Sequence, residues 1–189
     1  MDKIRCFIAT ELPLELKLKI DTYIDSLRNI SPQIKWIKAK NLHITLKFLG
    51  EIPYELIEKI HNELSDVSTI VNPFEMSVRG TGFFPNQNKP RVIWLGLQND
   101  SKNSIFKLHE WIDKKLQALG FEREKRRFSP HLTLGRIKFP DNIQKLSEFI
   151  NKNEFKSEFF KVDQIILMRS ELKPTGAEYS QIKNYMLGD

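Results

Sequence analysis

A short alternating pattern occurs twice in this 189-residue chain, once in each half. The segment HITLKFLG begins at His43 and HLTLGR begins at His131, and each has a threonine two residues after its histidine, with leucine or isoleucine in between. Residues two apart in a strand point to the same face, so His43 shares a face with Thr45, and His131 with Thr133. The pattern predicts two matching strands from two similar halves that line a polar cleft between them.

The rest of the chain alternates between helix-like and strand-like patterns. We expect helices where apolar residues recur at helical spacing, in segments 14–28, 53–64, 105–119 and 142–150. Strand patterns occur in segments 4–9, 33–38, 42–48, 74–85 (with breaks at Gly80 and Gly82), 91–97, 131–136, 158–169 and 177–186. Strands and helices mix without a strict βαβ rhythm, which predicts an α+β fold with largely antiparallel sheets. Because no Pro-, Gly- or Ser-rich linker divides the chain, we treat residues 1–189 as a single domain.

The composition is typical of a globular protein, with 40% hydrophobic and 29% charged residues. The net charge of +6 favours partners such as RNA or phosphorylated ligands, although a mildly basic protein without such a partner has the same balance. Cys6 is the only cysteine, which excludes an internal disulfide and favours a reducing compartment. The first apolar run is too short for a signal peptide or a membrane span, so we expect a cytoplasmic protein with no membrane partner.

Two facing imidazoles suit acid–base chemistry at phosphorus. Imidazole titrates near neutral pH, so one ring can accept a proton while the other donates one, as an in-line displacement requires. The hydroxyl groups of Thr45 and Thr133, with a nearby cation, can hold the phosphoryl oxygens. Arg136 lies five residues beyond His131 and is the candidate cation, with an ordinary surface arginine as the alternative.

A zinc site is the competing interpretation of two histidines. A third ligand would have to come from elsewhere, and neither motif is accompanied by an HExxH pattern or a carboxylate cluster, so we predict no metal. His61 and His109 lie on predicted helices without a threonine partner. We expect both of them on a helix surface or rim.

The chain resembles the two-histidine (2H) phosphoesterases, and within them the RNA 2′,3′-cyclic phosphodiesterase branch, historically called 2′-5′ RNA ligases. Beyond the twin HxTx motifs, the similar segments are RCFIATELP, IKWIKAKNLH, RGTGFFPNQNKPRVIWLGL, GFEREKRRFSPHLTLGR and LMRSELKPTGAEYS, which together with the motifs span almost the whole chain. The resemblance implies a bilobal, pseudo-twofold fold with outer helices and an active site in a central cleft. It also implies metal-independent hydrolysis of RNA 2′,3′-cyclic phosphate ends, or of a cyclic nucleotide, to 2′-phosphomonoesters without a cofactor.

The resemblance further implies a role for each motif residue. His43 would be the general acid that protonates the departing O3′, and His131 the general base that activates water. Thr45, Thr133 and Arg136 would bind the phosphate.

Aromatic and basic residues near the motifs are candidates for RNA contacts. Phe48 falls on the same alternate positions as the apolar residues of its strand, so we expect it in the core. Phe83 and Phe84 are candidates for lining the cleft, with burial as the alternative. Six basic residues that flank the motifs in sequence would form a rim for an RNA backbone, or else only a solvated charged face: Lys35, Lys38, Lys40, Arg123, Arg126 and Arg127. No uncovered apolar stripe stands out, so we expect a monomer.

Other functions remain open from the sequence. The same cleft would also suit 2′-5′ ligation of RNA halves, or hydrolysis of a small cyclic nucleotide or sugar phosphate. A non-catalytic RNA-binding module that uses only the basic rim is the alternative from a different class.

Overall fold

The structure, a computed structural model, describes residues 2–98, 102–140, 142–174 and 176–188. The helices in these residues are α1 (Leu14–Ile30), η1 (Ala39–Asn41), α2 (Leu56–Leu64), η2 (Val67–Thr69), α3 (Ser104–Gln117) and α4 (Ile143–Lys152). The strands are β1 (Lys3–Glu11), β2 (Lys35–Trp36), β3 (His43–Pro53), β4 (Phe74–Phe84), β5 (Val92–Gln98), β6 (His131–Arg136), β7 (Phe160–Val162), β8 (Gln164–Lys173) and β9 (Gly176–Met186).

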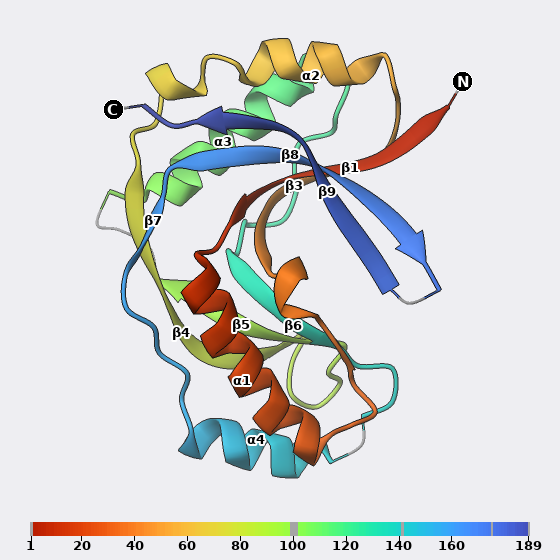
Figure 1. Ribbon diagram of the computed structural model, residues 1–189, viewed down its shortest axis with the longest axis vertical. Helices are drawn as coiled ribbons and strands as arrows, with labels where there is room; N and C mark the ends of the chain where they lie inside the picture. The colour runs from red at the N-terminus through yellow and green to blue at the C-terminus, as the bar shows by residue number, and fades with distance from the viewer. Residues whose placement is uncertain (1, 99–101, 141, 175, 189) are drawn as a thin grey trace.

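These strands form two antiparallel sheets, one in each of two lobes. The upper sheet in Figure 1 has the order β3–β1–β8–β9, with α2 and α3 on its outer side. The lower sheet has the order β2–β6–β5–β4–β7, and α1 and α4 lie on its outer side. The predicted bilobal α+β fold with antiparallel sheets and outer helices is therefore confirmed.

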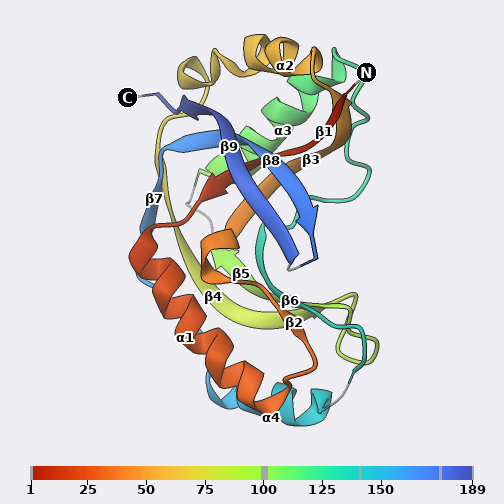
Figure 2. The ribbon, with the colours of Figure 1, turned by 45° about the vertical axis from the view of Figure 1, so that its right-hand side comes forward.

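The two lobes do not coincide with the two halves of the chain. The upper sheet joins β1 and β3 to the C-terminal strands β8 and β9, whose hairpin reaches beyond the rest of the sheet in Figures 1 and 2. Helix α1 follows β1 but packs in the lower lobe against α4, whereas α3 follows β5 of the lower sheet and packs behind β3. The chain therefore crosses between the lobes repeatedly.

The two motif strands alternate as predicted at their start. Ile44 in β3 and Leu132 in β6 are fully buried, while the histidine and threonine on either side of each face the opposite way and stay half-buried. Because the apolar residues of each strand are buried on one face, its histidine and threonine must lie on the opposite face.

A β-bulge in β3 reverses this alternation after Thr45. The pairing with β1 skips Leu46, so Leu46 and Lys47 are both buried and Phe48 turns to the polar face. Phe48 is 65% exposed. The prediction that Phe48 lies in the core is wrong, because the extra residue at Leu46 turns the side chains that follow to the other face, until a second irregularity at Leu49 restores the first parity.

Two predicted boundaries also differ from the structure. Pro53 ends β3, where it pairs with Lys3, instead of opening a helix, and α2 begins only at Leu56. The expected strand over 158–169 is two strands in different sheets, because the chain passes from β7 in the lower sheet to β8 in the upper one.

The two glycines of β4 bend the strand without ending it. Gly80, with a φ of +76°, lies at a bulge between Val78 and Thr81, and β4 then continues to Phe84. At Gly82, a Cβ atom would lie 2.4 Å from the indole ring of Trp94, so only glycine lets this ring approach the strand.

Candidate active site

A cleft of about 700 Å³ lies between the two sheets. Its lining comes from β3 and β6, from segment 35–41, from the end of β4 and from the β8–β9 hairpin. All five residues predicted from the motifs line it, namely His43, Thr45, His131, Thr133 and Arg136. The structure thus brings the two halves of the repeated pattern into one cavity.

The two motif histidines have the same local geometry. Nδ1 of His43 lies 2.7 Å from the carbonyl oxygen of Asn41, and Nδ1 of His131 lies 2.7 Å from that of Ser129. A carbonyl oxygen can only accept, so Nδ1 carries the hydrogen in both rings. In each ring, Nε2 is left as the atom that can take up or release a proton.

Aromatic rings surround His43. The ring centroid of Phe7 lies 4.8 Å away, and the Tyr179 ring packs edge-on at 5.1 Å. Burial lowers the pKa of His43, and the positive charge of Lys17 lowers it further. The hydrogen bond to Asn41 and the negative charge of Glu11 raise the pKa, but the net shift is downward. In the free protein, His43 therefore holds its proton less well than an exposed histidine.

An aromatic wall also supports His131. Phe84 packs edge-on against the His131 ring at 5.0 Å and stacks on Trp94, also at 5.0 Å. Phe84 lines the cleft, whereas Phe83 packs against the core, so the sequence-based expectation of a cleft-lining aromatic holds for Phe84 alone.

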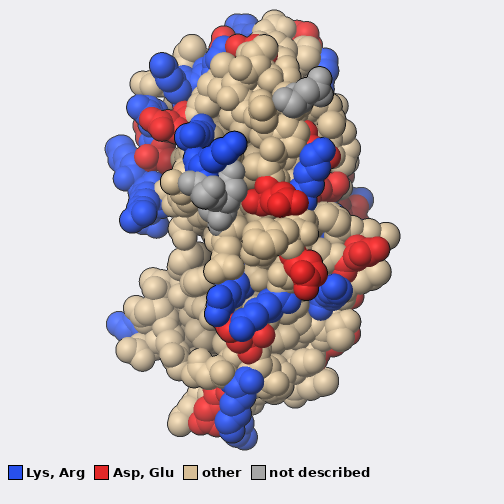
Figure 3. All heavy atoms as spheres, turned by 90° about the vertical axis from the view of Figure 1, so that its left-hand side faces the viewer, with Lys and Arg blue, Asp and Glu red and all other residues tan. Residues whose placement is uncertain are grey.

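The charge of the cleft is strongly unbalanced. Among the described residues that line it, one is acidic, Glu178, and five are basic: Arg5, Lys35, Lys38, Lys40 and Arg136. By contrast, acidic and basic side chains are interspersed over the face shown in Figure 3, although basic ones gather at its upper left edge. A cleft with this excess of positive charge attracts phosphate groups.

The predicted basic rim is only half present. Lys35, Lys38 and Lys40 line the cleft, but the three arginines of segment 122–127 do not. Arg123 instead makes an ion pair with Asp113 of α3. The arginines are close to His131 in sequence, but the loop that carries them runs along α3.

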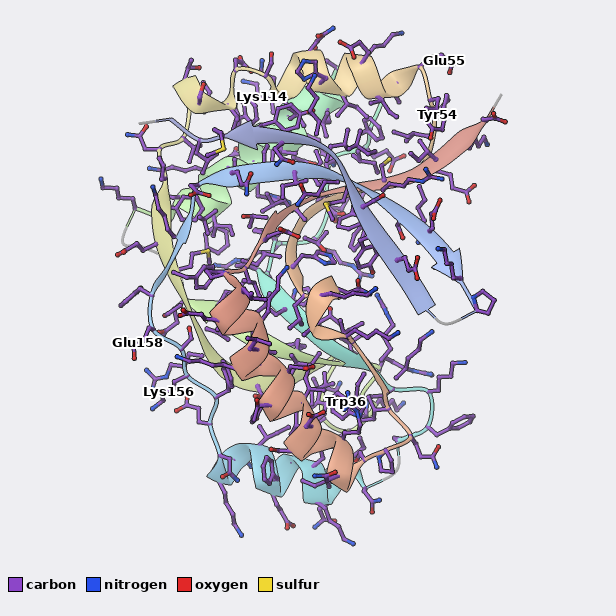
Figure 4. The ribbon with its side chains drawn as sticks, in the orientation of Figure 1. Trp36, Tyr54, Glu55, Lys114, Lys156 and Glu158 are labelled. Carbon is purple, nitrogen blue, oxygen red and sulfur yellow. The ribbon has the colours of Figure 1, made fainter. Side chains whose placement is uncertain are left out.

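Several cleft residues were missed by the sequence analysis. Phe7 looks like an ordinary core residue of a buried strand, and Tyr179 lies far along the chain in a strand with no motif. Trp36, labelled in Figure 4, lines the cleft beside β6 and donates its Nε1–H to the carbonyl oxygen of Ser31 at 3.1 Å. No spacing in the sequence connects these residues to the histidines.

The other two histidines do not line the cleft. His61 is half-buried on α2 against the ring of Tyr185, as expected for a rim residue. His109 is only 9% exposed and stacks on Phe128 at 4.0 Å, so its expected place on a helix surface or rim is wrong. The reason is that the loop before β6 folds back over this face of α3. Among the described residues, no three His, Cys, Asp or Glu side chains are grouped to hold a metal ion.

Comparison with known proteins supports the internal repeat. The family described as LigT like Phosphoesterase matches the chain twice in succession, over residues 11–94 and 95–179. The chain belongs to the LigT-like phosphoesterase family. Each match contains one HxTx motif, so the repeat seen in the sequence of this phosphoesterase corresponds to two successive family matches.

The phosphoesterase is similar to proteins named RNA 2′,3′-cyclic phosphodiesterase. It is 36% identical to one from Methanothermobacter thermautotrophicus over 98% of this chain and all of the relative, and 39% identical to one from Methanocaldococcus jannaschii over 96% and 99%. Among solved structures, TT0787 of Thermus thermophilus matches with a TM-score of 0.82 and 27% identity over 98% and 100% of the two chains. E. coli LigT complexed with 3′-AMP shares the fold over both full lengths, with a TM-score of 0.78 and 21% identity.

Proposed function

We propose that this LigT-like phosphoesterase hydrolyses the 2′,3′-cyclic phosphate at an RNA end to a 2′-phosphomonoester. The observation that carries the proposal is the pair of identically bonded imidazoles, His43 and His131, in one basic cleft. The names of the relatives that match nearly the whole chain support the same substrate class.

In the proposed reaction, His131 takes a proton from water, and the water oxygen attacks phosphorus opposite O3′. The bond from phosphorus to O3′ breaks as His43 gives its proton to the leaving oxygen. Hydroxyl groups of Thr45 and Thr133, and the guanidinium of Arg136, hold the phosphoryl oxygens while charge is redistributed. The five-membered cyclic phosphate is strained, so the reaction needs positioning and proton transfer and no metal ion.

Substrate binding would prepare His43 for its role as an acid. Burial lowers the pKa of His43 in the free protein, so the ring is largely neutral at neutral pH. An anionic phosphate beside the ring favours the charged imidazole and raises its pKa. The acid would therefore be charged when substrate is bound.

The exposed surface beside the histidines fits an RNA strand. Phe48 offers a flat apolar ring on the cleft face of β3, where a nucleobase can stack. Lys35, Lys38 and Lys40 add positive charge to the same cleft lining, where they can contact backbone phosphates.

Product identity tests this proposal directly. An oligoribonucleotide that ends in a 2′,3′-cyclic phosphate is incubated with the protein in EDTA, and the product is identified by phosphorus NMR. A 2′-phosphate is expected. A 3′-phosphate, or no turnover by well-folded protein, contradicts the proposal. Rates on cyclic mononucleotides and on longer RNAs separate an RNA end from a small cyclic nucleotide as the preferred substrate.

A further inference from the structure

The lysine four residues after His43 is turned away from the cleft. In a regular strand, Lys47 would share the cleft face with His43 and Thr45, where it would be a natural phosphate ligand. The bulge at Leu46 instead points Lys47 into the protein, and its side chain is only 3% exposed. There its ammonium group makes an ion pair with the equally buried carboxylate of Asp113 on α3.

This ion pair holds the loop that leads to the other histidine. Nζ of Lys47 donates to the carbonyl oxygen of Glu122 at 2.9 Å. The Asp113 carboxylate accepts hydrogen bonds from Nε of Arg123 at 3.2 Å and from the backbone N–H of Glu124 at 3.3 Å. Burial raises the pKa of Asp113, but the hydrogen bonds from Lys47, Arg123 and the Glu124 N–H, together with the charge of Lys47, outweigh burial and keep the pKa below its usual value. Two buried charges thus bind three consecutive loop residues.

The second half of the loop is anchored on the same helix. The Phe128 ring lies parallel to the His109 ring, with centroids 4.0 Å apart and an interplanar angle of 10°. The next residue, Ser129, supplies the carbonyl oxygen that accepts the hydrogen bond from Nδ1 of His131. Residues 121–130 contain no helix or strand, and His131 itself begins β6, where it pairs with Gly96 of β5. This pairing places the backbone of His131, and the loop anchors place the Ser129 carbonyl oxygen that orients its ring.

Stability alone is a poor reason for such a pair. Removing two charges from water is costly, and well-packed apolar residues of the same volume are often as stabilising or more so. We propose that Lys47 and Asp113 are positioning residues that set His131 relative to His43. Through Lys47, the strand that carries His43 is bonded to the loop that leads into β6 and His131. The part of the test that measures kcat rests on the proposed hydrolysis of the cyclic phosphate.

The double variant Lys47→Met/Asp113→Leu tests this inference. It removes both charges together, so no unpaired charge remains in the core, and we expect a folded protein by thermal unfolding. The expected kcat is about 10- to 100-fold lower, because a small misplacement of a catalytic group is enough for such a loss. In ¹⁵N spectra of the imidazoles, the His131 signals should shift or broaden more than those of His43. A folded double variant with wild-type kcat and unchanged His131 signals would overturn the inference.

A second ion pair on the same helix provides the matched control. Lys115 of α3 pairs with Asp66, next to η2, at 3.0 Å, and not with a residue of the loop before His131. The variant Lys115→Met/Asp66→Leu should therefore keep wild-type kcat and unchanged His131 signals. An equal loss of kcat in this control would show a general effect of disturbing α3 and would also overturn the inference.

Two further measurements keep the test decisive. If the double variant does not fold, Arg123→Met removes only the half-exposed partner of Asp113, and a kcat loss of about 3- to 10-fold with a shifted His131 signal is expected. Unchanged kcat and signals in that variant would refute the positioning role. If the wild-type protein hydrolyses no cyclic phosphate, the proposed function fails, whereas the imidazole spectra still report whether Lys47 and Asp113 position His131.

Discussion

His43 and His131 make the same hydrogen bond from two different sheets. In each case, Nδ1 lies 2.7 Å from the carbonyl oxygen two residues earlier in the chain. This bond fixes the tautomer of both rings and leaves both Nε2 atoms available for proton transfer. The duplication of the chain thus extends to the chemistry of its two imidazoles.

Replacing either histidine should remove most activity. We expect His43→Ala and His131→Ala each to lower kcat/KM on an RNA 2′,3′-cyclic phosphate by roughly 100-fold or more, the scale of general acid–base catalysis. His61→Ala, outside the cleft lining on α2, is the control and should keep wild-type kcat/KM. Near-normal activity in either motif variant would contradict the paired proton transfer.

A modified leaving group should separate the roles of the two histidines. When sulfur replaces the bridging 3′ oxygen of the cyclic phosphate, the leaving thiolate needs no proton. If His43 is the acid, His43→Ala should recover most of its lost rate on this substrate, whereas His131→Ala should not. If the rate of His131→Ala recovers instead, His131 is the acid and His43 is the base.

The two charges near His43 should move its pKa in opposite directions. The positive charge of Lys17 lowers the pKa of His43 and the negative charge of Glu11 raises it. Lys17→Met should therefore raise the pKa, and Glu11→Gln should lower it further below the ordinary value of about 6.5. Titration of the His43 imidazole by NMR measures both shifts, and shifts in the same direction would contradict this electrostatic account.

Phe48 and Phe7 should differ sharply when each is replaced by alanine. Phe48 is 65% exposed on the cleft face, so Phe48→Ala should leave thermal stability unchanged. Its KM for RNA should rise by about 5- to 150-fold, corresponding to about 1–3 kcal/mol of base stacking. Phe7 is 3% exposed, and Phe7→Ala should lower the free energy of unfolding by about 3–5 kcal/mol. An unchanged KM in a stable Phe48→Ala protein would refute the stacking site.

The cleft lysines should control the salt dependence of RNA binding. Lys38→Gln/Lys40→Gln should reduce the slope of log affinity against log salt concentration by roughly 0.7 for each RNA phosphate that a lysine no longer neutralises. Lys114→Gln/Lys156→Gln removes the same charge from positions outside the cleft lining, labelled in Figure 4. Equal slopes for the two variants would show that only net charge matters.

Local patterns were enough to predict much of the site. Alternation of apolar and polar residues placed His43 and Thr45 on one face of a strand and His131 and Thr133 on another, as the structure shows. The repeat indicated that the two strands line one cleft, and all five motif residues do so. These predictions depend only on the period of a strand and on the burial of its apolar face.

Patterns failed where an irregularity or a distant segment decided the outcome. Phe48 was expected in the core, but the bulge at Leu46 turns it into the cleft and buries Lys47 in its place. His109 was expected on a helix surface or rim, but the loop before β6 covers it with Phe128. Neither the bulge nor the course of that loop has a signal in local spacing.

The sequence by itself determined the helices and strands of an α+β class and the four polar groups of the twin motifs, because these follow from the spacing of residues within one strand or helix. Only the tertiary structure decided which other side chains join them. Phe7 and Tyr179 reach His43 through strand pairing across the chain, and Lys47 meets Asp113 through the packing of β3 on α3. Such contacts depend on which segments become neighbours, and that is settled by the packing of the whole core.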